Sequence, residues 1–490
     1  MADSLKQKTF SGLVWNFLET FVLQAFGFVQ GVILARLLMP SDYGLIAMTG
    51  IFFAVSYTLM DSGFTTALIR KKERTDVDYS TVFVTNLVIS LVLCVILCLC
   101  ATWIADFYHE PLLQKIVYVN AVLLFLWSFV SVQTARLSIY LNFKAKSIIN
   151  VIATVITGLV SIVLAYMGWG VWSLILPNFV SIAIRFILYW RYQHWLPKIG
   201  FSWETYKEYF AFGSKLMLTN LLNTIYSNVY PLIIGKYYSS SKLGYYTKGQ
   251  NYASLSSAVL GGVIYRVTFP VLSKIQDNDD KLRDIYRRMI RVTAYVVFPL
   301  AALLFVLARP FVIALITEKW APCIPYLQVL CFASMWNPIH SLNLNLLLIK
   351  GHSNLYLRLE VIKKIIGVFV LFITIPMGLL VMCYGQLLAA ILFLIINTYY
   401  TGKFIKVGFF QQMKDLTPTI LYAAVMGMVV WGVTRYLPEG ILQLLLGLFV
   451  GFLSYFLISK ISKSMELFYL IDIVKQSVSG KFISQRSSSR

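Results

Sequence analysis

Acidic side chains are scarce in this sequence, and charged residues of either sign are few. Only 21 of the 490 residues are Asp or Glu, against 42 Lys and Arg, and charged residues make up 13% of the chain. Soluble domains carry charge on about a quarter of their residues, so this composition excludes an ordinary soluble domain. With 59% hydrophobic residues, the sequence predicts an all-α polytopic membrane protein.

Cysteine is also rare. The six cysteines lie in or beside apolar segments, without the spacing of a metal site or of a secreted disulfide framework. The net charge of +21 would suggest nucleic acid as a partner of a soluble protein. No basic tract is interleaved with aromatic residues that could stack on bases, so we expect no nucleic-acid partner and interpret the basic residues as topology signals.

Long polar segments are absent as well. The loops between apolar runs are short, so no segment could hold a soluble catalytic domain, and we do not expect an enzyme. The first run lacks a small-residue cleavage site and is expected to remain as a membrane helix. Fourteen runs are long enough to cross a bilayer, at approximately residues 12–35, 44–69, 80–105, 113–138, 147–167, 170–190, 212–236, 243–267, 292–316, 325–349, 356–380, 382–402, 417–437 and 441–460.

The basic residues predict the orientation of these helices. With the N-terminus in the cytoplasm, most of the 42 Lys and Arg fall in segments on the cytoplasmic side, as the positive-inside rule requires. This bias persists to the last helix and predicts that both termini are cytoplasmic. Residues 279–291 alternate apolar and basic side chains at helical spacing, which indicates an amphipathic helix leading into the ninth membrane helix.

A weak internal repeat predicts two related halves. Residues 34–44 (LARLLMPSDYG) align with residues 234–244 (IGKYYSSSKLG), which pairs Arg36 with Lys236 and Gly44 with Gly244. We therefore expect two six-helix lobes related by a pseudo-two-fold axis, plus two C-terminal helices. The expected parts are an N-lobe (1–195), a cytoplasmic interfacial linker (196–211), a C-lobe (212–402), helices thirteen and fourteen (403–465) and a cytoplasmic tail (466–490), whose end is Ser-rich, basic and expected to be disordered.

Small and polar residues follow one face of the first and of the seventh membrane helix. Two such faces could line a hydrated cleft between the lobes, and close helix packing through small residues is an equally ordinary use. Pro231 in the seventh helix is a candidate bending point. The polar cleft candidates are Asn16, Thr20 and Gln24 in the first helix, and Asn220, Asn223, Thr224 and Ser227 in the seventh.

Three carboxylates fall at possible membrane depth. Asp61 ends an apolar run, and a carboxylate in a bilayer costs roughly 2.5 to 3.5 kcal/mol, so it is expected to face a partner or a wet cavity. Its alternative role is a structural hydrogen bond between helices. Asp61 and Glu19 are the candidates for coupling to a proton or sodium gradient. Glu360 is a further candidate, although an ion pair with the nearby Lys364 or Arg358 is the simpler interpretation.

Several stretches resemble a known family, the Wzx-type flippases of lipid-linked oligosaccharides. This family belongs to the polysaccharide-transporter branch of the multidrug/oligosaccharidyl-lipid/polysaccharide exporter superfamily, and the similarity is greatest to its colanic- and teichuronic-acid exporter-like members. The matching stretches are RLLMPSDYG (36–44), DSGFTTALIRKK (61–72), RVTFPVLSKIQD (266–277), EKWAPCIPYLQVL (318–330) and KGHSNLYLRLEVIKK (350–364).

The resemblance implies alternating access that moves an undecaprenyl-pyrophosphate-linked oligosaccharide from the cytoplasmic to the periplasmic leaflet of the bacterial inner membrane, for surface polysaccharide assembly. A polysaccharide polymerase and a chain-length regulator are expected partners, and no cofactor is expected. The seventh helix has no acidic residue here, so a coupling carboxylate in that helix cannot be carried over. Candidate phosphate-binding residues lie near helix ends, where each could instead anchor the helix at the membrane surface: Arg36, Arg136, Lys215, Lys236, Arg266 and Arg309, with Lys350 as a further possibility.

Three other functions are compatible with parts of this pattern. A multidrug or small-cation antiporter of the same superfamily would share the repeat but would favour an acidic, aromatic cavity and twelve helices. A membrane polymerase or glycosyltransferase would need a large external loop or an acidic metal-binding motif, and the sequence has neither. A non-transporting component of a glycan assembly complex would share the composition.

Overall fold

A computed structural model describes residues 2–61, 63–71, 73–197 and 200–478. In these ranges the chain forms nineteen α-helices and two 3₁₀ helices, without a strand, which confirms the all-α prediction. Contacts divide the chain into two compact units, Met1–Thr247 and Lys248–Arg490. Each unit is described separately below, and the predicted lobe boundaries stay a prediction.

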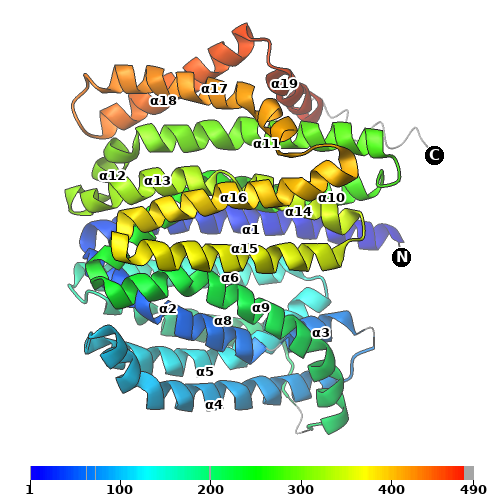
Figure 1. The fold of residues 1–490 in the computed structure, drawn as a ribbon. Coiled ribbons are helices and arrows are strands. Elements are labelled where there is room, and N and C mark those ends of the chain that lie inside the picture. The colour runs from blue at the N-terminus through cyan, green and yellow to red at the C-terminus, as the bar shows by residue number, and fades with distance from the viewer. Residues whose placement is uncertain (1, 62, 72, 198–199, 479–490) are drawn as a thin grey trace. The chain divides into compact units, whose positions relative to one another are not determined.

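The first unit contains nine helices and the start of a tenth. In Figure 1, α4 lies along α5, and the closest pairs also include α1 with α6 and α2 with α9. The helices are α1 (Ala2–Leu37), α2 (Pro40–Asp61), α3 (Phe64–Arg70), α4 (Asp76–Tyr108), α5 (Leu112–Ile139), α6 (Phe143–Tyr166), α7 (Trp172–Ile175), α8 (Pro177–Gln193), α9 (Trp203–Tyr237) and the first turns of α10 (Ser240–Ser273).

The run predicted as one helix over residues 44–69 is broken near Gly63. This glycine has φ of 72°, a left-handed conformation that side chains rarely adopt. Its backbone also approaches α9 so closely that a β-carbon on it would lie 2.6 Å from the carbonyl oxygen of Gly213. A contact between distant parts of the chain therefore decides the break, which hydropathy could not reveal.

The loop after α3 is fastened by charged side chains. Thr75 and Asp78 form a capping box at the start of α4. The Lys71 amine donates to Asp78 Oδ1 (2.9 Å) and to Glu208 Oε2 of α9 (3.1 Å). Partial burial opposes the charge on Lys71, but these hydrogen bonds and the two negative charges prevail and raise its pKa. Lys71 thus joins the loop to α9.

The second unit begins at Lys248 within α10. Its helices are α11 (Asp279–Val306), α12 (Ala308–Ile316), η1 (Glu318–Cys323), α13 (Ile324–Ser334), α14 (Asn337–Ile349), α15 (Ser353–Thr374), η2 (Ile375–Met377), α16 (Leu379–Ile405), α17 (Phe409–Thr434), α18 (Ile441–Ile461) and α19 (Met465–Val478). The amphipathic segment 279–291 is the first part of α11, as predicted. In Figure 1, α17 lies beside both α11 and α18.

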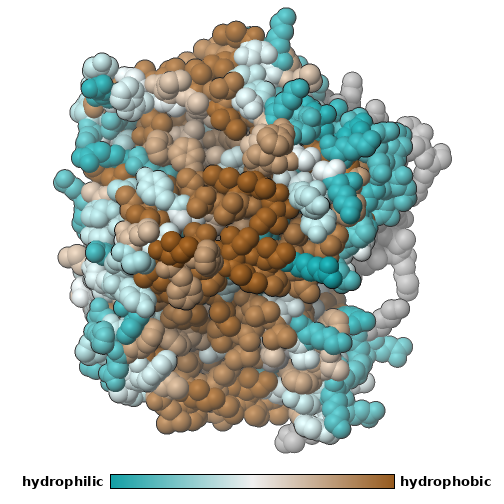
Figure 2. Space-filling view, viewed as in Figure 1, coloured by the Kyte–Doolittle hydropathy of each residue, from teal (hydrophilic) through white to brown (hydrophobic). Residues whose placement is uncertain are grey.

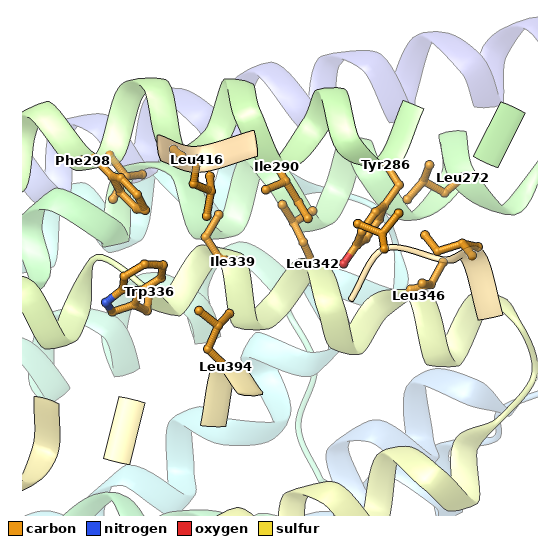
Figure 3. Packing of buried hydrophobic residues seen from close by; sticks show 14 of the residues in the cluster. Leu272, Tyr286, Ile290, Phe298, Trp336, Ile339, Leu342, Leu346, Leu394 and Leu416 are labelled. Atoms are coloured by element: carbon orange, nitrogen blue, oxygen red, sulfur yellow. The ribbon is translucent and has the colours of Figure 1, made fainter. Parts of the chain in front are cut away.

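The core of the second unit lies between α11, α14, α16 and α17. Figure 3 shows Tyr286, Ile290 and Phe298 of α11 facing Trp336 and the leucines of α14. At one end of this core the buried Asn343 Oδ1 accepts from the Tyr286 hydroxyl and from Gln412 Nε2, each at 2.8 Å. Beside it, Arg287 donates two hydrogen bonds to the carboxylate of Asp415, from Nε at 2.7 Å and from Nη2 at 2.6 Å. Helix α17 is therefore bonded firmly to α11 and α14.

The chain is a multi-pass membrane protein. In Figure 2, hydrophobic side chains gather over the middle of the helices and hydrophilic ones toward their ends. Large apolar side chains such as Val92, Leu99 and Trp103 of α4 are more than half exposed, as expected for a surface that contacts lipid.

Ten helices or helix pairs of the described residues are long and apolar enough to cross a membrane. The four other predicted spans fall on α9, α10, α13 with α14, and α15. Helices α9, α10 and α15 carry more polar residues. The span over α13 and α14 is divided into helices of 11 and 13 residues. A count of fourteen stays a prediction.

Candidate functional site

A carboxylate lies in the helix bundle of the first unit. Glu19 projects from α1 toward α6, where its Oε2 accepts from the Ser147 hydroxyl at 2.6 Å and its Oε1 accepts from Asn150 Nδ2 at 2.8 Å. The amide oxygen of Asn150 in turn accepts from the buried Tyr189 hydroxyl of α8 at 3.0 Å. Three helices thus contribute to one chain of hydrogen bonds that begins at the carboxylate.

A cation completes this group of residues. Arg185 lies one turn before Tyr189 on α8, near the middle of α6, where it donates to Thr154 Oγ1 at 3.4 Å. Its guanidinium lies 5.5 Å from the centre of the Trp127 ring, a cation–π distance. It interacts electrostatically with Glu19 without coming within 4 Å of a carboxylate in the described part of the chain. We call Glu19, Ser147, Asn150, Tyr189, Thr154 and Arg185 the unit-1 polar cluster.

Sequence reasoning found only one member of this cluster. Glu19 is a predicted candidate, whereas Arg185, which lies inside the predicted span 170–190, is not among the predicted site residues. An arginine between Ile184 and Phe186 in an apolar run is itself a signal, because such a charge needs a partner at membrane depth. Asn150 and Ser147 gave no comparable signal, since polar residues of this size occur throughout membrane helices.

The other two carboxylate candidates lie elsewhere. Asp61 is the last residue of α2, beside the break at Gly63. Glu360 of α15 pairs with Lys363, three residues later, whereas the spacing predicts Lys364 or Arg358 as its partner. The buried Lys363 lies 6.0 Å from the ring of Phe393, and His340 of α14 lies 3.4 Å from Asn397 of α16 on the same side of the second unit.

Arg136 has the most enclosed side chain of the phosphate-binding candidates whose side chains the structure describes. Its side chain is 9% exposed at the end of α5, and its guanidinium lies 5.0 Å from the ring centre of Tyr79 and 4.8 Å from that of Trp195. Two of its nitrogens, Nε and Nη1, have no hydrogen-bond partner among the described residues. Through its contact with Trp195, Arg136 attaches the segment that follows α8 to the end of α5.

The remaining basic candidates differ in exposure. Lys236 donates to the carbonyl of Phe107 at 2.6 Å, and Arg309 forms an exposed ion pair with Glu439 at 2.7 Å. Arg36 and Lys215 are exposed. The side chain of Arg266 lies outside the described residues. Arg36, Lys215 and Lys236 are not brought together in one site among the described residues of the first unit.

The polar faces of α1 and α9 are largely accessible. Thr20 and Gln24 are exposed and Asn16 is half-buried on α1, while Asn220, Asn223 and Ser227 are exposed on α9. Thr224 instead hydrogen-bonds with Thr58 of α2 at 3.1 Å. Helix packing, one of the two uses that the sequence left open, therefore occurs at Thr224, and cleft lining stays a prediction.

An apolar cavity opens between α11, α13 and α17 in the second unit. It has a volume of about 550 Å³ and is lined mainly by Phe305, Phe332, Met335, Met428 and Trp431. Its polar lining residue, Gln328, donates its amide to the carbonyl of Phe305 at 3.2 Å. Such a lining suits a hydrocarbon chain.

Comparison with known proteins decides the family. The profile of a family described as polysaccharide biosynthesis protein matches residues 33–325. The chain belongs to this family. It is also 27% identical over 402 residues to the lipopolysaccharide biosynthesis protein WzxC of Escherichia coli K12, covering 81% of this chain and 80% of WzxC. The predicted resemblance is thereby confirmed.

Two solved structures have the same fold as this family member. The lipid II flippase MurJ, in an inward closed conformation, superposes with a TM-score of 0.73 at 14% identity, over 92% of this chain and 98% of MurJ. An inward-facing multidrug resistance MATE transporter of the MOP superfamily gives 0.62 at 15% identity, over 81% and 99%. At these identities the likeness concerns the fold alone.

Proposed function

We propose that this protein is a flippase that moves an undecaprenyl-pyrophosphate-linked oligosaccharide from the cytoplasmic to the periplasmic leaflet by alternating access. The observation that carries the proposal is the family match over residues 33–325. A flippase needs a membrane-spanning bundle with polar groups inside it, and the first unit supplies both. The product would serve surface polysaccharide assembly, with a polymerase and a chain-length regulator as partners and without chemistry of its own.

The proposed topology is that of the sequence prediction. Fourteen spans would place both termini in the cytoplasm, and two six-helix lobes would be related by a pseudo-two-fold axis. The repeat receives support from a reciprocal contact within the first unit, in which Gly44 packs against Ser240 while Gly244 packs against Pro40. Gly44 corresponds to Gly244 and Pro40 to Ser240 in the aligned repeat, so the two contacts exchange equivalent residues, as a local two-fold relationship would require.

The unit-1 polar cluster is the proposed coupling site. Glu19 is the carboxylate of this cluster, and its neighbours Ser147 and Asn150 donate hydrogen bonds to it. Arg185 interacts electrostatically with Glu19, so a cation arriving at Glu19 must compete with the guanidinium. Arg185 would repel either cation. A proton forms a covalent bond to the carboxylate oxygen and Na⁺ does not, so a proton fits this arrangement better than sodium.

The apolar cavity between α11, α13 and α17 is the proposed resting place of the lipid chain. Its walls offer no charge to a phosphate, whereas a polyprenyl chain would bury apolar surface there. The exposed cations Arg36 and Lys215 and the polar faces of α1 and α9 are the proposed contacts for pyrophosphate and sugar.

Multidrug export is the second candidate, because the MATE transporter shares the fold. The fold therefore does not distinguish the two activities. The family match favours the polysaccharide function, and the part of α9 within the predicted span 212–236 contains no carboxylate that could pair with a drug cation.

Lectin accessibility in sealed vesicles tests the proposal. Vesicles would contain the native lipid-linked glycan with the wild-type protein, with no protein, with Glu19→Gln, or with Glu439→Gln as a control for loss of an exposed carboxylate. We expect the sugar to reach the opposite face only with protein, and the dependence on a proton gradient to disappear in Glu19→Gln alone. If the sugar never crosses with the wild type, the flippase function is wrong for that glycan.

A further inference from the structure

A small pocket lies between the first turns of α11 and the C-terminal helix α19, inside the second unit. Its volume is about 330 Å³, and charged side chains from both helices line it together with apolar ones. It is separate from the polar cluster and from the apolar cavity, and the proposed transport function makes no use of it.

The sequence of α11 explains one wall of the pocket. The side chain of Asn278 caps this helix by accepting from the backbone N–H of Lys281 at 3.0 Å. Leu282, Tyr286 and Ile290 then lie fully buried on one face. Arg288 and Arg291, three residues apart, share another face, and both line the pocket.

The start of α19 forms the opposite wall. Ser464 precedes the helix and donates to Glu466 Oε2 at 2.9 Å. The other oxygen of Glu466 lies 3.3 Å from Arg291 Nε, which ties α19 to α11. Tyr469 and Asp472 lie on the same face as Glu466, one to two turns further along.

One cation and one anion are left over after this pairing. Arg291 and Glu466 neutralise each other. The guanidinium of Arg288 lies 5.3 Å from the centre of the Tyr469 ring and has no carboxylate within 4 Å in the described part of the chain. Asp472, on the other wall, likewise has no ion-pair partner among the described residues. The pocket therefore offers one positive and one negative group from opposite sides.

The surroundings indicate contact with lipid. Met465 and Phe468, which also line the pocket, are 75% and 49% exposed, and Ile461 just before them is 79% exposed. Apolar side chains exposed beside charged ones are typical of a helix lying at the membrane surface. A ligand entering from this side would bring an apolar portion and a small charged head.

We propose that the pocket between Arg288 and Asp472 binds the head group of phosphatidylethanolamine. Its phosphodiester would accept hydrogen bonds from Arg288, and its primary ammonium would donate to Asp472. Met465 and Phe468 would contact the first carbons of the acyl chains. An anionic phospholipid would leave Asp472 opposed to a like charge, and phosphatidylcholine could not donate a hydrogen bond from its quaternary ammonium.

Native mass spectrometry of the full-length protein tests this site. The protein, released from detergent, would be titrated with phosphatidylethanolamine, phosphatidylglycerol and phosphatidylcholine in turn, and with soluble phosphoethanolamine to separate head-group binding from lipid binding. We expect the wild type to retain phosphatidylethanolamine most strongly, and Arg288→Gln to weaken that retention about tenfold. Soluble phosphoethanolamine should compete weakly, since it lacks the acyl contacts.

Asp472→Asn provides a test that does not depend on the amount of folded protein. This variant should bind phosphatidylethanolamine and phosphatidylglycerol about equally, because it removes only the group that distinguishes them. Arg283→Gln is the matched control, since Arg283 lies on the same helix, pairs with Asp280 and Asp284 and does not line the pocket. Equal retention of the three lipids by the wild type, or an unchanged lipid preference in Asp472→Asn, would overturn the proposal.

Discussion

Gly44 and Gly244 each pack against the backbone of the residue four positions before the other. A β-carbon on Gly44 would overlap the carbonyl of Ser240, and one on Gly244 would overlap the carbonyl of Pro40. All four residues lie in the first unit. The start of α2 and the start of α10 therefore meet through backbone atoms, at the two segments that the internal repeat aligned.

This contact predicts a strong effect of adding one methyl group. Gly44→Ala or Gly244→Ala should lower the free energy of unfolding by about 1–3 kcal/mol, because neither neighbouring backbone can yield as a flexible side chain could. Thermal unfolding in detergent measures the change. Gly27→Ala is the control, since nothing lies within 4 Å of the added carbon, and it should not destabilise the protein. Wild-type stability of Gly44→Ala would contradict the close contact.

The unit-1 polar cluster predicts coupling between Glu19 and Arg185. Glu19→Gln and Arg185→Gln should each destabilise the protein, because each leaves the other charge uncompensated inside the bundle. The double variant should lose less than the sum of the two, with a coupling energy of about 0.5–3 kcal/mol. The same cycle on the exposed pair Arg309 and Glu439 should give a smaller coupling, of about 0–1 kcal/mol. Equal coupling energies in the two cycles would show that the cluster does not act as a unit.

The buried hydrogen bonds of the second unit predict a cost for removing Gln412. In Gln412→Leu the oxygen of Asn343 and the hydroxyl of Thr401 each lose a partner in a region without solvent access. The free energy of unfolding should fall by about 1–3 kcal/mol. Thr417→Val is the control, because Thr417 is exposed and bonds only to the carbonyl of Met413. Chemical denaturation would compare the two, and similar losses would argue against the network.

The apolar cavity predicts a dependence on the length of the lipid chain. Gly427 lies in its wall, so Gly427→Phe would fill the cavity and should slow the crossing of a full-length polyprenyl substrate several-fold more than that of a short-chain analogue. Gly432→Phe, on the same helix but with nothing within 4 Å of an added carbon, should leave both rates near the wild-type values. Equal slowing of both substrates by Gly427→Phe would exclude this cavity as the place of the chain.

Part of the candidate site could be predicted from the sequence. Glu19 is a candidate because a carboxylate in an apolar run costs free energy in a bilayer unless it faces a partner or a wet cavity. Its partners Ser147 and Asn150 lie 128 and 131 residues away along the chain, and no spacing rule connects them to it. Arg185 is not predicted as a site residue because a cation near the end of a span can anchor the helix at the membrane surface, whereas in the structure its side chain reaches Trp127 and Thr154.

The sequence by itself determined that this is a helical membrane protein and where its apolar helices lie, because crossing a bilayer requires about 20 apolar residues in every span. It also determined the family, through motifs spread along the first eleven helices. Only the tertiary structure decided that α2 ends before Gly63, that Glu360 pairs with Lys363, and that Arg288 and Asp472 line one pocket. Backbone approach and charge pairing depend on which helices become neighbours, and that choice is made by packing between residues far apart in the chain.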